Sequence, residues 1–214
     1  FHKRGLISKY FKGIYNALPE FNKLPLYATG TVDQLYFPRL NGKSFGGPIA
    51  NGAASFTGKL YVDVAGTYKF YTVSDDGSKL YINNDLVVAN GGNHSMRERS
   101  GTLSLIAGFH DIKIDYYDAG GPGGIKLFWE GPNFTKQVIP ASVLMHAQAD
   151  YDEAFDAIDQ DGDGLTDKLE DEYGSDKTKI DSNGDGLTDF ERYSLGLDAM
   201  TIDTDGDGVS DYDE

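Results

Sequence analysis

Apolar and polar side chains alternate with a period of two along most of the first two-thirds of the chain. The alternation is clearest over residues 68–73 and 80–82, on either side of a short acidic segment. Because successive side chains of a strand point to opposite faces of a sheet, this pattern predicts half-buried strands. The predicted strands cover residues 6–11, 35–37, 55–64, 67–74, 79–88, 102–107, 111–117 and 125–129.

Turn residues separate these strands. Residues 65–66, 83–85 and 107–108 predict tight, hairpin-like connections, whereas residues 89–100 and 118–124 predict longer loops. Many short strands with no helical pattern between them are typical of an all-β fold, either a β-sandwich or a barrel. The 27 Gly, 14 Tyr and 12 Phe residues fit a β fold with many turns.

The period changes to that of a helix between residues 140 and 158. Apolar residues recur three or four positions apart at Val143 or Leu144, Ala147, Tyr151, Phe155 and Ile158. This spacing places them on one face of a helix. We interpret the segment as a linker helix that packs this face on the β domain, in preference to a helix that binds a partner.

From residue 159 onward the sequence repeats with a period of 22, marked by Asp159, Asp181 and Asp203. A fixed period of this kind predicts an array of small units. The predicted organisation is therefore an all-β domain (1–145), a helical linker (146–158) and three repeats (159–214).

Each repeat begins with a loop of the EF-hand type. Oxygen-bearing side chains stand at positions one, three, five and nine, glycine stands at six, and position seven offers a carbonyl. The predicted calcium ligands are Asp159, Asp161, Asp163, the Leu165 carbonyl, Asp167 and Glu170 in the first loop, Asp181, Asn183, Asp185, the Leu187 carbonyl and Asp189 in the second, and Asp203, Asp205, Asp207, the Val209 carbonyl, Asp211 and Glu214 in the third. Calcium suits such flexible sets of six or more oxygens better than magnesium does.

The first and third loops have a glutamate at position twelve, and the second loop lacks it. Arg192 stands there, and Glu191 lies one position early. The second calcium site is therefore either weaker than the others or completed by an oxygen from a neighbouring repeat.

Between each loop and the glycine that follows it, Gly174 or Gly196, only about two helical turns fit. The long flanking helices of an EF-hand are therefore missing. Residues 159–214 resemble the thrombospondin type-3 repeats of bacteria. The resemblance implies a spacer stiffened by several calcium ions, and not a calcium sensor.

The charge of the chain is concentrated in the repeats. Residues 1–149 carry 15 Lys and Arg against 11 Asp and Glu, and residues 150–214 carry 4 against 23, which gives net charges of +4 and −19. A tail this acidic either stays disordered or recruits cations, and the regular spacing favours cations. Nucleic acid is not an expected partner, because the tail would repel phosphate and the body has no basic cluster.

The absence of cysteine rules out disulfides, thiolate metal sites and a cysteine nucleophile. No apolar run approaches the ~18 residues of a membrane span, so membrane insertion is not expected. Residues 1–5 are not expected to belong to a signal peptide, and the third loop ends at the last residue of the sequence. We therefore expect the chain to be part of a longer polypeptide.

Two adjacent carboxylates, Asp75 and Asp76, stand before Gly77 between two predicted strands. One interpretation is a solvated turn, since Asp and Gly are common in turns. The other is a calcium site, because adjacent carboxylates repel one another unless a cation lies between them. Glycosidase carboxylates stand apart across the scissile bond, so no catalytic residues are predicted.

Residues 5–144 resemble the protective-antigen-type (PA14) domain of adhesins, yeast flocculins and glycosidases. The resemblance rests on the segments GLISKYF (5–11), GTYKF (66–70), SDDGSKLYI (74–82), LIAG (105–108), IDYYD (114–118) and GIKLFW (124–129). It implies a β-sandwich. In the carbohydrate-binding members it also implies an Asp-Asp pair, joined by a cis peptide bond, that holds a calcium ion in contact with two sugar hydroxyls. Asp75 and Asp76 match this pair.

The resemblance also implies a second binding loop at residues 118–124. Yeast members contribute an Asn there that this sequence lacks, so Asp118 or the carbonyls of Gly120, Gly121 and Gly123 would take its place.

Two further residues in the long loop before Ser100, Asn93 and His94, are candidates for contact with a bound sugar, although an ordinary surface role is the simpler interpretation for a lone His. Trp129 is interpreted as a core residue.

The predicted function is that of a calcium-dependent lectin module of a larger extracellular adhesin, which binds carbohydrate on a cell surface or in a matrix. The alternatives are a structural or protein-interaction module of a secreted toxin-like or surface protein, and an accessory domain of a glycoside hydrolase. Extracellular modules bind calcium at about 10⁻⁴ to 10⁻³ M, which fits a secreted or cell-surface location.

Overall fold

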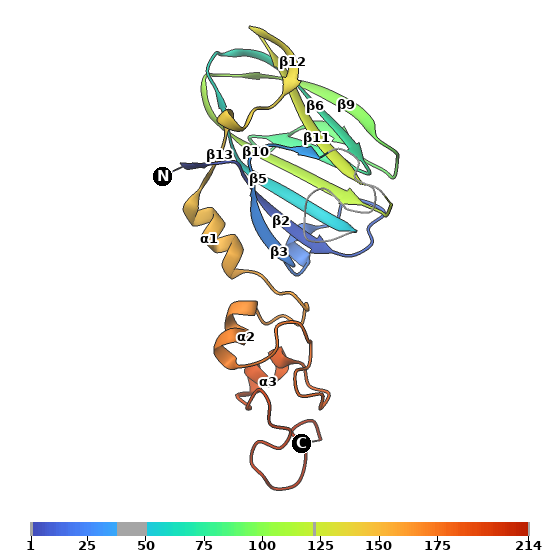
Figure 1. The fold of residues 1–214 in the computed structure, drawn as a ribbon, viewed down its shortest axis with the longest axis vertical. Helices are drawn as coiled ribbons and strands as arrows, with labels where there is room; N and C mark the ends of the chain where they lie inside the picture. Colours follow the sequence, from blue (N-terminus) through green and yellow to red (C-terminus); the bar gives the residue numbers. More distant parts are fainter. Residues whose placement is uncertain (1, 38–50, 122, 214) are drawn as a thin grey trace.

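The computed structural model describes residues 2–37, 51–121 and 123–213 as a β-sandwich, a short helix and an array of loops (Figure 1). In the described residues the larger sheet has eight strands: β1 (His2–Arg4), β2 (Leu6–Lys12), β3 (Ala28–Val32), β5 (Gly52–Val62), β7 (Ser78–Ile82), β8 (Asp85–Asn90), β10 (Gly108–Asp118) and β13 (Leu144–Ala147). The smaller sheet has five: β4 (Tyr36–Phe37), β6 (Gly66–Asp75), β9 (Arg97–Leu105), β11 (Gly124–Gly131) and β12 (Phe134–Val138). The predicted all-β sandwich is confirmed.

Both sheets are antiparallel and face each other across one apolar core. The larger sheet has the order β1-β13-β5-β10-β7-β8, with β2 beside another part of β5 and β3 outside β2. The smaller sheet has the order β12-β11-β6-β9, with β4 on β11. Phe56, Phe70, Leu80 and Ile114 are fully buried between them. Burial contributes about 1.5–3 kcal/mol for each such side chain, so this core stabilises the domain.

Trp129 belongs to the core, as predicted. It is 5% exposed, and its ring centroid lies 5.6 Å from that of Tyr68 and 4.8 Å from that of Phe134. It is therefore not an exposed platform for a sugar ring.

Each predicted strand overlaps an observed one, but residues 79–88 form two strands, β7 and β8. Asn83 and Asn84 make the turn between them with φ of 49° and 70°. Asn tolerates this left-handed backbone better than most residues do. The prediction missed β1, β3, β12 and β13, which are short and contain few alternating apolar positions.

The helical period seen over residues 140–158 holds only in its second part, within the predicted linker at 146–158. Helix α1 covers only Gln148–Asp156, and the preceding residues form β13, which pairs with β5 and β1. Leu144 lies opposite Leu60, and both are fully buried. On α1, Ala154 is buried but Phe155 is 57% exposed, so the helix packs only part of its apolar face. Sheet pairing outweighs the local helical period here.

Two further helices, α2 (Asp167–Tyr173) and α3 (Asp189–Leu195), follow the first two loops of the repeats. Thr166 and Thr188 cap their N-termini. Gly174 and Gly196 end them with φ of 92° and 75°, as the sequence predicts. Single turns of 3-10 helix lie at Phe21–Lys23 (η1) and Ala141–Val143 (η2).

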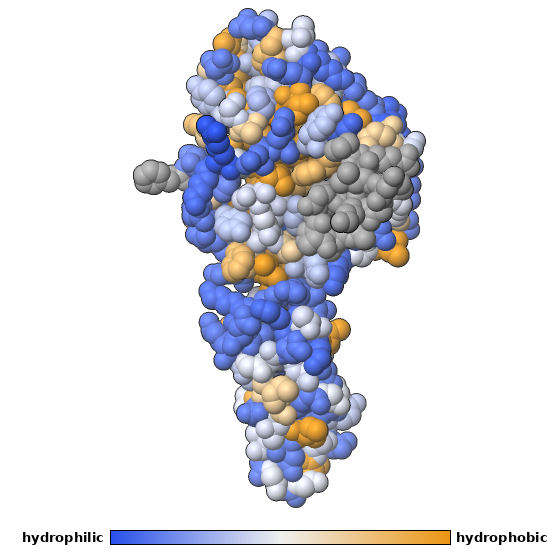
Figure 2. Space-filling model, in the orientation of Figure 1, coloured by the Kyte–Doolittle hydropathy of each residue, from blue (hydrophilic) through white to orange (hydrophobic). Residues whose placement is uncertain are grey.

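The repeats are attached to the sandwich next to η1. Leu26 forms a parallel bridge with Ile158, and the Asp159 N–H donates to the Leu26 carbonyl at 2.9 Å. From this point the repeats extend away from the sandwich as a narrow rod (Figure 1), with a mostly hydrophilic surface (Figure 2). None of the helices in the described part of the chain has the length and apolar character needed to cross a membrane.

Candidate functional site

Three connections between the two sheets meet at one end of the sandwich. They join β6 to β7 (residues 76–77), β8 to β9 (91–96) and β10 to β11 (119–123). Strand register brings them together: Asp75 lies opposite Gly124, and Ser78 lies opposite both Asn90 and Tyr116. The acidic pair is therefore enclosed by the two longer loops. We call this end the crossover site.

Asp75 and Asp76 are 7% and 6% exposed and are joined by a cis peptide bond, as the resemblance implied. The Asp76 carboxylate is held by both longer loops. The His94 N–H donates to its Oδ1 at 2.7 Å, and the Ala119 N–H donates to its Oδ2 at 2.8 Å. This burial does not fit a solvated turn.

Tyr116 links the acidic pair to the start of β11 by hydrogen bonds. Its hydroxyl donates to the Asp75 carbonyl at 2.5 Å and accepts from the Gly124 N–H at 3.0 Å. Burial and the nearby Asp118 carboxylate raise the pKa of Tyr116 far above its ordinary value, so the hydroxyl keeps its proton.

Asp118 is fully buried at the end of β10, and its Oδ1 accepts from the Gly120 N–H at 2.8 Å. A Cβ on Gly123 would lie 2.3 Å from Asp118 Oδ2 and 2.6 Å from the Tyr116 hydroxyl, so the position requires glycine. Gly120 and Gly121 are exposed, with φ of 132° and 92°. The predicted second loop thus packs against the acidic pair.

Asn93 and His94 lie at this end, where their side chains hold their own loop. Asn93 Oδ1 accepts from the Tyr117 hydroxyl at 2.8 Å. The His94 ring nitrogens lie 2.9 Å from the Ser95 carbonyl and 3.2 Å from the Asn90 carbonyl. Asn93 is exposed and His94 half-buried, so both remain at the surface of the crossover site.

A buried polar network next to the acidic pair was not predicted. The hydroxyls of Ser74 and Ser78 lie 2.8 Å apart, and Asn90 Nδ2 donates to Ser74 Oγ at 3.1 Å. Arg97 Nε donates to Asn90 Oδ1 at 2.9 Å. The sequence feature that could have indicated this network is the set of polar residues at the ends of predicted strands. Polar groups that are buried there must be hydrogen-bonded.

The oxygen atoms available as metal ligands at the crossover site suit a hard cation. Asp75, Asp76 and Asp118 are almost fully buried, and uncompensated buried charge is costly. Each carboxylate oxygen has two lone pairs, so an oxygen of Asp76 that accepts one N–H can still bind an ion. The site is more open than a compact triad: in the described residues, the groups of three carboxylates with oxygens within 4.8 Å of one another all lie in the repeats.

The three repeat loops share one hydrogen-bond pattern. At position one, Asp159 accepts from the Gly162 N–H at 2.8 Å and from the Gly164 N–H at 3.3 Å. Asp181 and Asp203 do the same in their loops. The carboxylate oxygens cluster in two loops, around Asp159, Asp161 and Asp163 and around Asp203, Asp205 and Asp207. In the second loop the matching residues are Asp181, Asn183 and Asp185. In all three loops the position-seven N–H donates to the position-five Asp; the position-seven residues are Leu165, Leu187 and Val209.

Positions nine and twelve are placed differently from the EF-hand expectation. The position-nine residues Asp167, Asp189 and Asp211 accept from the backbone N–H at position two of their own loops, at 2.9, 3.0 and 2.9 Å. Glu170, at position twelve, forms a separate carboxylate group with Asp161 and Asp189. Glu214 lies outside the described residues.

Negative charge accumulates around Glu170. Burial, together with Asp161, Asp163 and other nearby carboxylates, raises the pKa of Glu170 to about 8. Burial and the carboxylates of Asp163 and Asp159 raise the pKa of Asp161 to about 6. Within the described residues, neither carboxyl group forms an ion pair with a Lys or Arg side chain.

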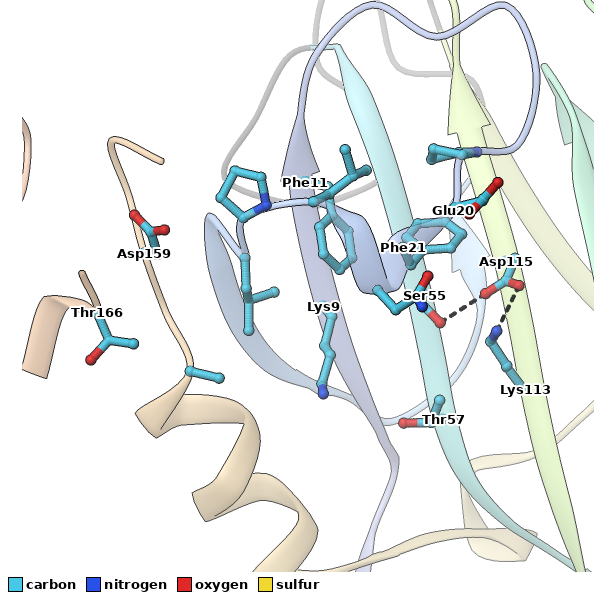
Figure 3. Close-up of a pocket in the computed structure, with 16 residues that line it drawn as sticks. Lys9, Phe11, Glu20, Phe21, Ser55, Thr57, Lys113, Asp115, Asp159 and Thr166 are labelled. Carbon is cyan, nitrogen blue, oxygen red and sulfur yellow. Dashed lines mark hydrogen bonds and ion pairs between the residues drawn. The ribbon is translucent and has the colours of Figure 1, made fainter. Parts of the chain in front are cut away.

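A cavity of about 700 Å³ lies elsewhere, between the sandwich and the first repeat (Figure 3). The residues labelled in the figure are Lys9, Phe11, Glu20, Phe21, Ser55, Thr57, Lys113, Asp115, Asp159 and Thr166. The Asp115 carboxylate in its wall is already paired, with Ser55 Oγ at 2.8 Å and Lys113 Nζ at 2.9 Å. This cavity between the sandwich and the first repeat is distinct from the crossover site.

Comparison with known proteins matches residues 11–142 to the PA14 domain, which is more than half of the chain. The chain belongs to the PA14 domain family. It is 37% identical over 90 residues to the anti-sigma-I factor RsgI3 of Acetivibrio thermocellus, a match that covers 42% of this chain and 14% of that protein.

Among solved structures, an anti-sigma factor domain-containing protein is 28% identical, with a TM-score of 0.57 over 67% of this chain and 48% of its own. The PA14 sugar-binding domain of an RTX adhesin is 19% identical, with a TM-score of 0.58 over 67% of this chain and 99% of its own. At that identity the second match shows the sandwich fold alone. The chain spans about half or less of the length of the anti-sigma relatives.

Proposed function

We propose that the chain is a calcium-dependent carbohydrate-binding module of a longer extracellular protein, mounted on a spacer stiffened by calcium. The observation that carries this proposal is the buried Asp75-Asp76 pair, in which N–H groups of two loops hold the Asp76 carboxylate at one end of the sandwich. The adhesin domain that shares the fold is described as sugar-binding. The proposed role is binding, and no residue is assigned to catalysis.

Asp75 and Asp76, with Asp118 or the carbonyls of Gly120, Gly121 and Gly123, would hold the calcium ion. When bound, the ion supplies coordination positions for two hydroxyls of a sugar. The chain's own contribution is to fix the carboxylates beforehand: the N–H groups of His94 and Ala119 orient Asp76, and the Tyr116 hydroxyl fixes the Asp75 carbonyl. Asn93 and His94 line the rim where a sugar would lie.

The test is glycan-array binding in millimolar calcium, repeated with a chelator and with two variants. Asp75→Asn removes one charge at the crossover site and is expected to abolish binding. Asp111→Asn is the matched control, because that exposed Asp lies at the other end of β10 and pairs only with Lys59 in the described residues. Binding that survives the chelator would refute calcium dependence. Binding absent from the folded protein would refute the lectin function.

A second candidate function follows from the anti-sigma relatives. A binding module of this kind would serve as the ligand-sensing part of a regulator if the longer protein also bound a sigma factor. A pull-down of purified sigma factors with the full-length protein separates the two. Capture of a sigma factor, with glycan binding retained by the module, supports sensing over adhesion.

A further inference from the structure

The 22-residue period places equivalent residues at two junctions between repeats. At the first junction, between repeats one and two, these residues are Asp161, Asp163, Glu170 and Asp189. At the second junction, between repeats two and three, the same positions hold Asn183, Asp185, Arg192 and Asp211. The side-chain charges differ accordingly: four carboxylates give −4 at the first junction, whereas two carboxylates and one guanidinium give −1 at the second.

The second junction is neutralised from within the chain. Arg192 is fully buried, and its guanidinium forms ion pairs with Asp185 and, at 2.6 Å, with Asp211 of the next repeat. It also donates to the carbonyls of Asp198, at 2.7 Å and 2.9 Å, and Thr201. A single cationic side chain thus bridges repeats two and three.

The first junction has carboxylates at all four matching positions, and among the described residues no Lys or Arg side chain forms an ion pair with them. Glu170 occupies the position of Arg192, and its oxygens lie within 4.8 Å of those of Asp161 and of Asp189 from the next repeat. Glu170 and Asp189 are fully buried. In the described part of the chain, Glu170 Oε2 and Asp161 Oδ2 are buried without a hydrogen-bond partner. The Asp163 carboxylate reaches the same junction, where the Phe190 N–H donates to it at 2.8 Å.

We propose that a divalent cation binds between repeats one and two, held by Asp161, Asp163, Glu170 and Asp189, and that Arg192 replaces this cation between repeats two and three. Buried carboxylates require a positive partner, and oxygen-only donors select a hard cation such as calcium. Asp189 therefore binds the ion of the preceding repeat, while in its own loop it accepts the position-two N–H. This inference rests on the proposed calcium-stiffened spacer and assigns one ion within it.

A matched pair of variants of the whole chain tests the assignment by calorimetric titration with calcium alone. Asp189→Asn and Asp211→Asn change the same position in successive repeats, and Asn preserves the bond from the position-two N–H. Asp189→Asn is expected to abolish the binding of one calcium ion or lower its affinity by at least about tenfold, since even changes to residues around the ligands lower metal affinity that much. Asp211→Asn is expected to leave the calcium stoichiometry unchanged, because in this proposal Asp211 pairs with Arg192 and not with an ion.

Equally weakened calcium binding in both variants would mean that position nine binds the ion of its own loop. This result would overturn the junction site but leave a calcium-loaded spacer. An unchanged titration of Asp189→Asn, or no calcium binding by the repeats at all, would also overturn it. Glycan binding by Asp189→Asn is expected to match the unaltered chain, which separates this outcome from failure of the crossover site.

A reciprocal exchange provides a second test if Asp189→Asn folds poorly. Glu170→Arg copies the second junction onto the first and is expected to lose one calcium ion while the repeats stay folded in a chelator. Arg192→Glu copies the first junction onto the second and is expected to gain one. A Glu170→Arg variant that binds the full number of ions would overturn the proposal.

Discussion

At the scale of single residues, the crossover site depends on positions where any larger side chain would collide. Gly123 lies directly against the Asp118 carboxylate and the Tyr116 hydroxyl, and Gly77 lies against the Tyr117 ring, where a Cβ would approach within 2.3 Å. Gly77 is not a ligand in the proposed mechanism, and Gly123 would contribute only its backbone carbonyl. Both allow two loops to pack on the acidic pair closely enough to fix its geometry.

We predict that Gly123→Ala destabilises the sandwich by about 1–3 kcal/mol, as overpacking typically does, and weakens glycan binding. Gly91→Ala is the control, because a Cβ there meets nothing within 4 Å and the backbone needs no left-handed conformation. Its free energy of unfolding is expected to change by less than about 0.5 kcal/mol. Urea denaturation of both variants checks this, and equal stabilities would contradict the role assigned to Gly123.

At the scale of elements, the boundary between β13 and α1 illustrates how packing overrides a local period. Residues 143–147 carry apolar side chains that satisfy a helical spacing, yet β5 offers an open edge beside them. Leu144 gains complete burial by joining that edge. The sandwich therefore extends into the segment expected to be a linker.

We predict that Leu144→Ala lowers the free energy of unfolding of the sandwich by about 2–5 kcal/mol, the range for a fully buried Leu. Phe155→Ala, on the exposed face of α1, is expected to change it by about 0.5 kcal/mol or less. Thermal denaturation of the two variants measures the difference. A larger loss from Phe155→Ala would indicate that the helix, and not β13, closes the sandwich.

The sequence predicted the long strands, because alternation over several residues reports directly on a sheet with one buried face. It missed β3 and β12, whose few residues are mostly half-buried or exposed. It identified Asp75 and Asp76, and it identified Arg192 as a departure from the loop pattern. It could not predict that Arg192 meets Asp211 or that Asp189 meets Glu170, since these contacts depend on how successive repeats pack.

At the scale of the whole molecule, charge is separated between a mildly basic sandwich and a strongly acidic rod. The net charge is +4 over residues 1–149 and −19 over residues 150–214, a range that includes most of α1 as well as the rod. Self-repulsion of this size opposes a compact rod unless cations bind to it. Calcium removal is therefore expected to act on the two parts differently.

We predict that a chelator accelerates amide hydrogen exchange in α2, next to the first junction, while β5 and β10 keep their protection. The reason is that the sandwich core is apolar, whereas the first junction gathers four carboxylates. Hydrogen exchange followed by mass spectrometry, with and without the chelator, measures this. Unchanged exchange in α2 would contradict calcium stiffening, and parallel loss of protection in β5 would show that the sandwich itself needs the ion.

The bridge between Leu26 and Ile158 has a mechanical consequence. A rod joined only through α1 would be free to swivel about one linker, but this rod is attached both there and at the segment after η1. Torque applied to the far end of the repeats is therefore transmitted to the sandwich at two separated points. The direction in which the crossover site faces then follows the direction of the rod, so the repeats aim the site as well as extending its reach.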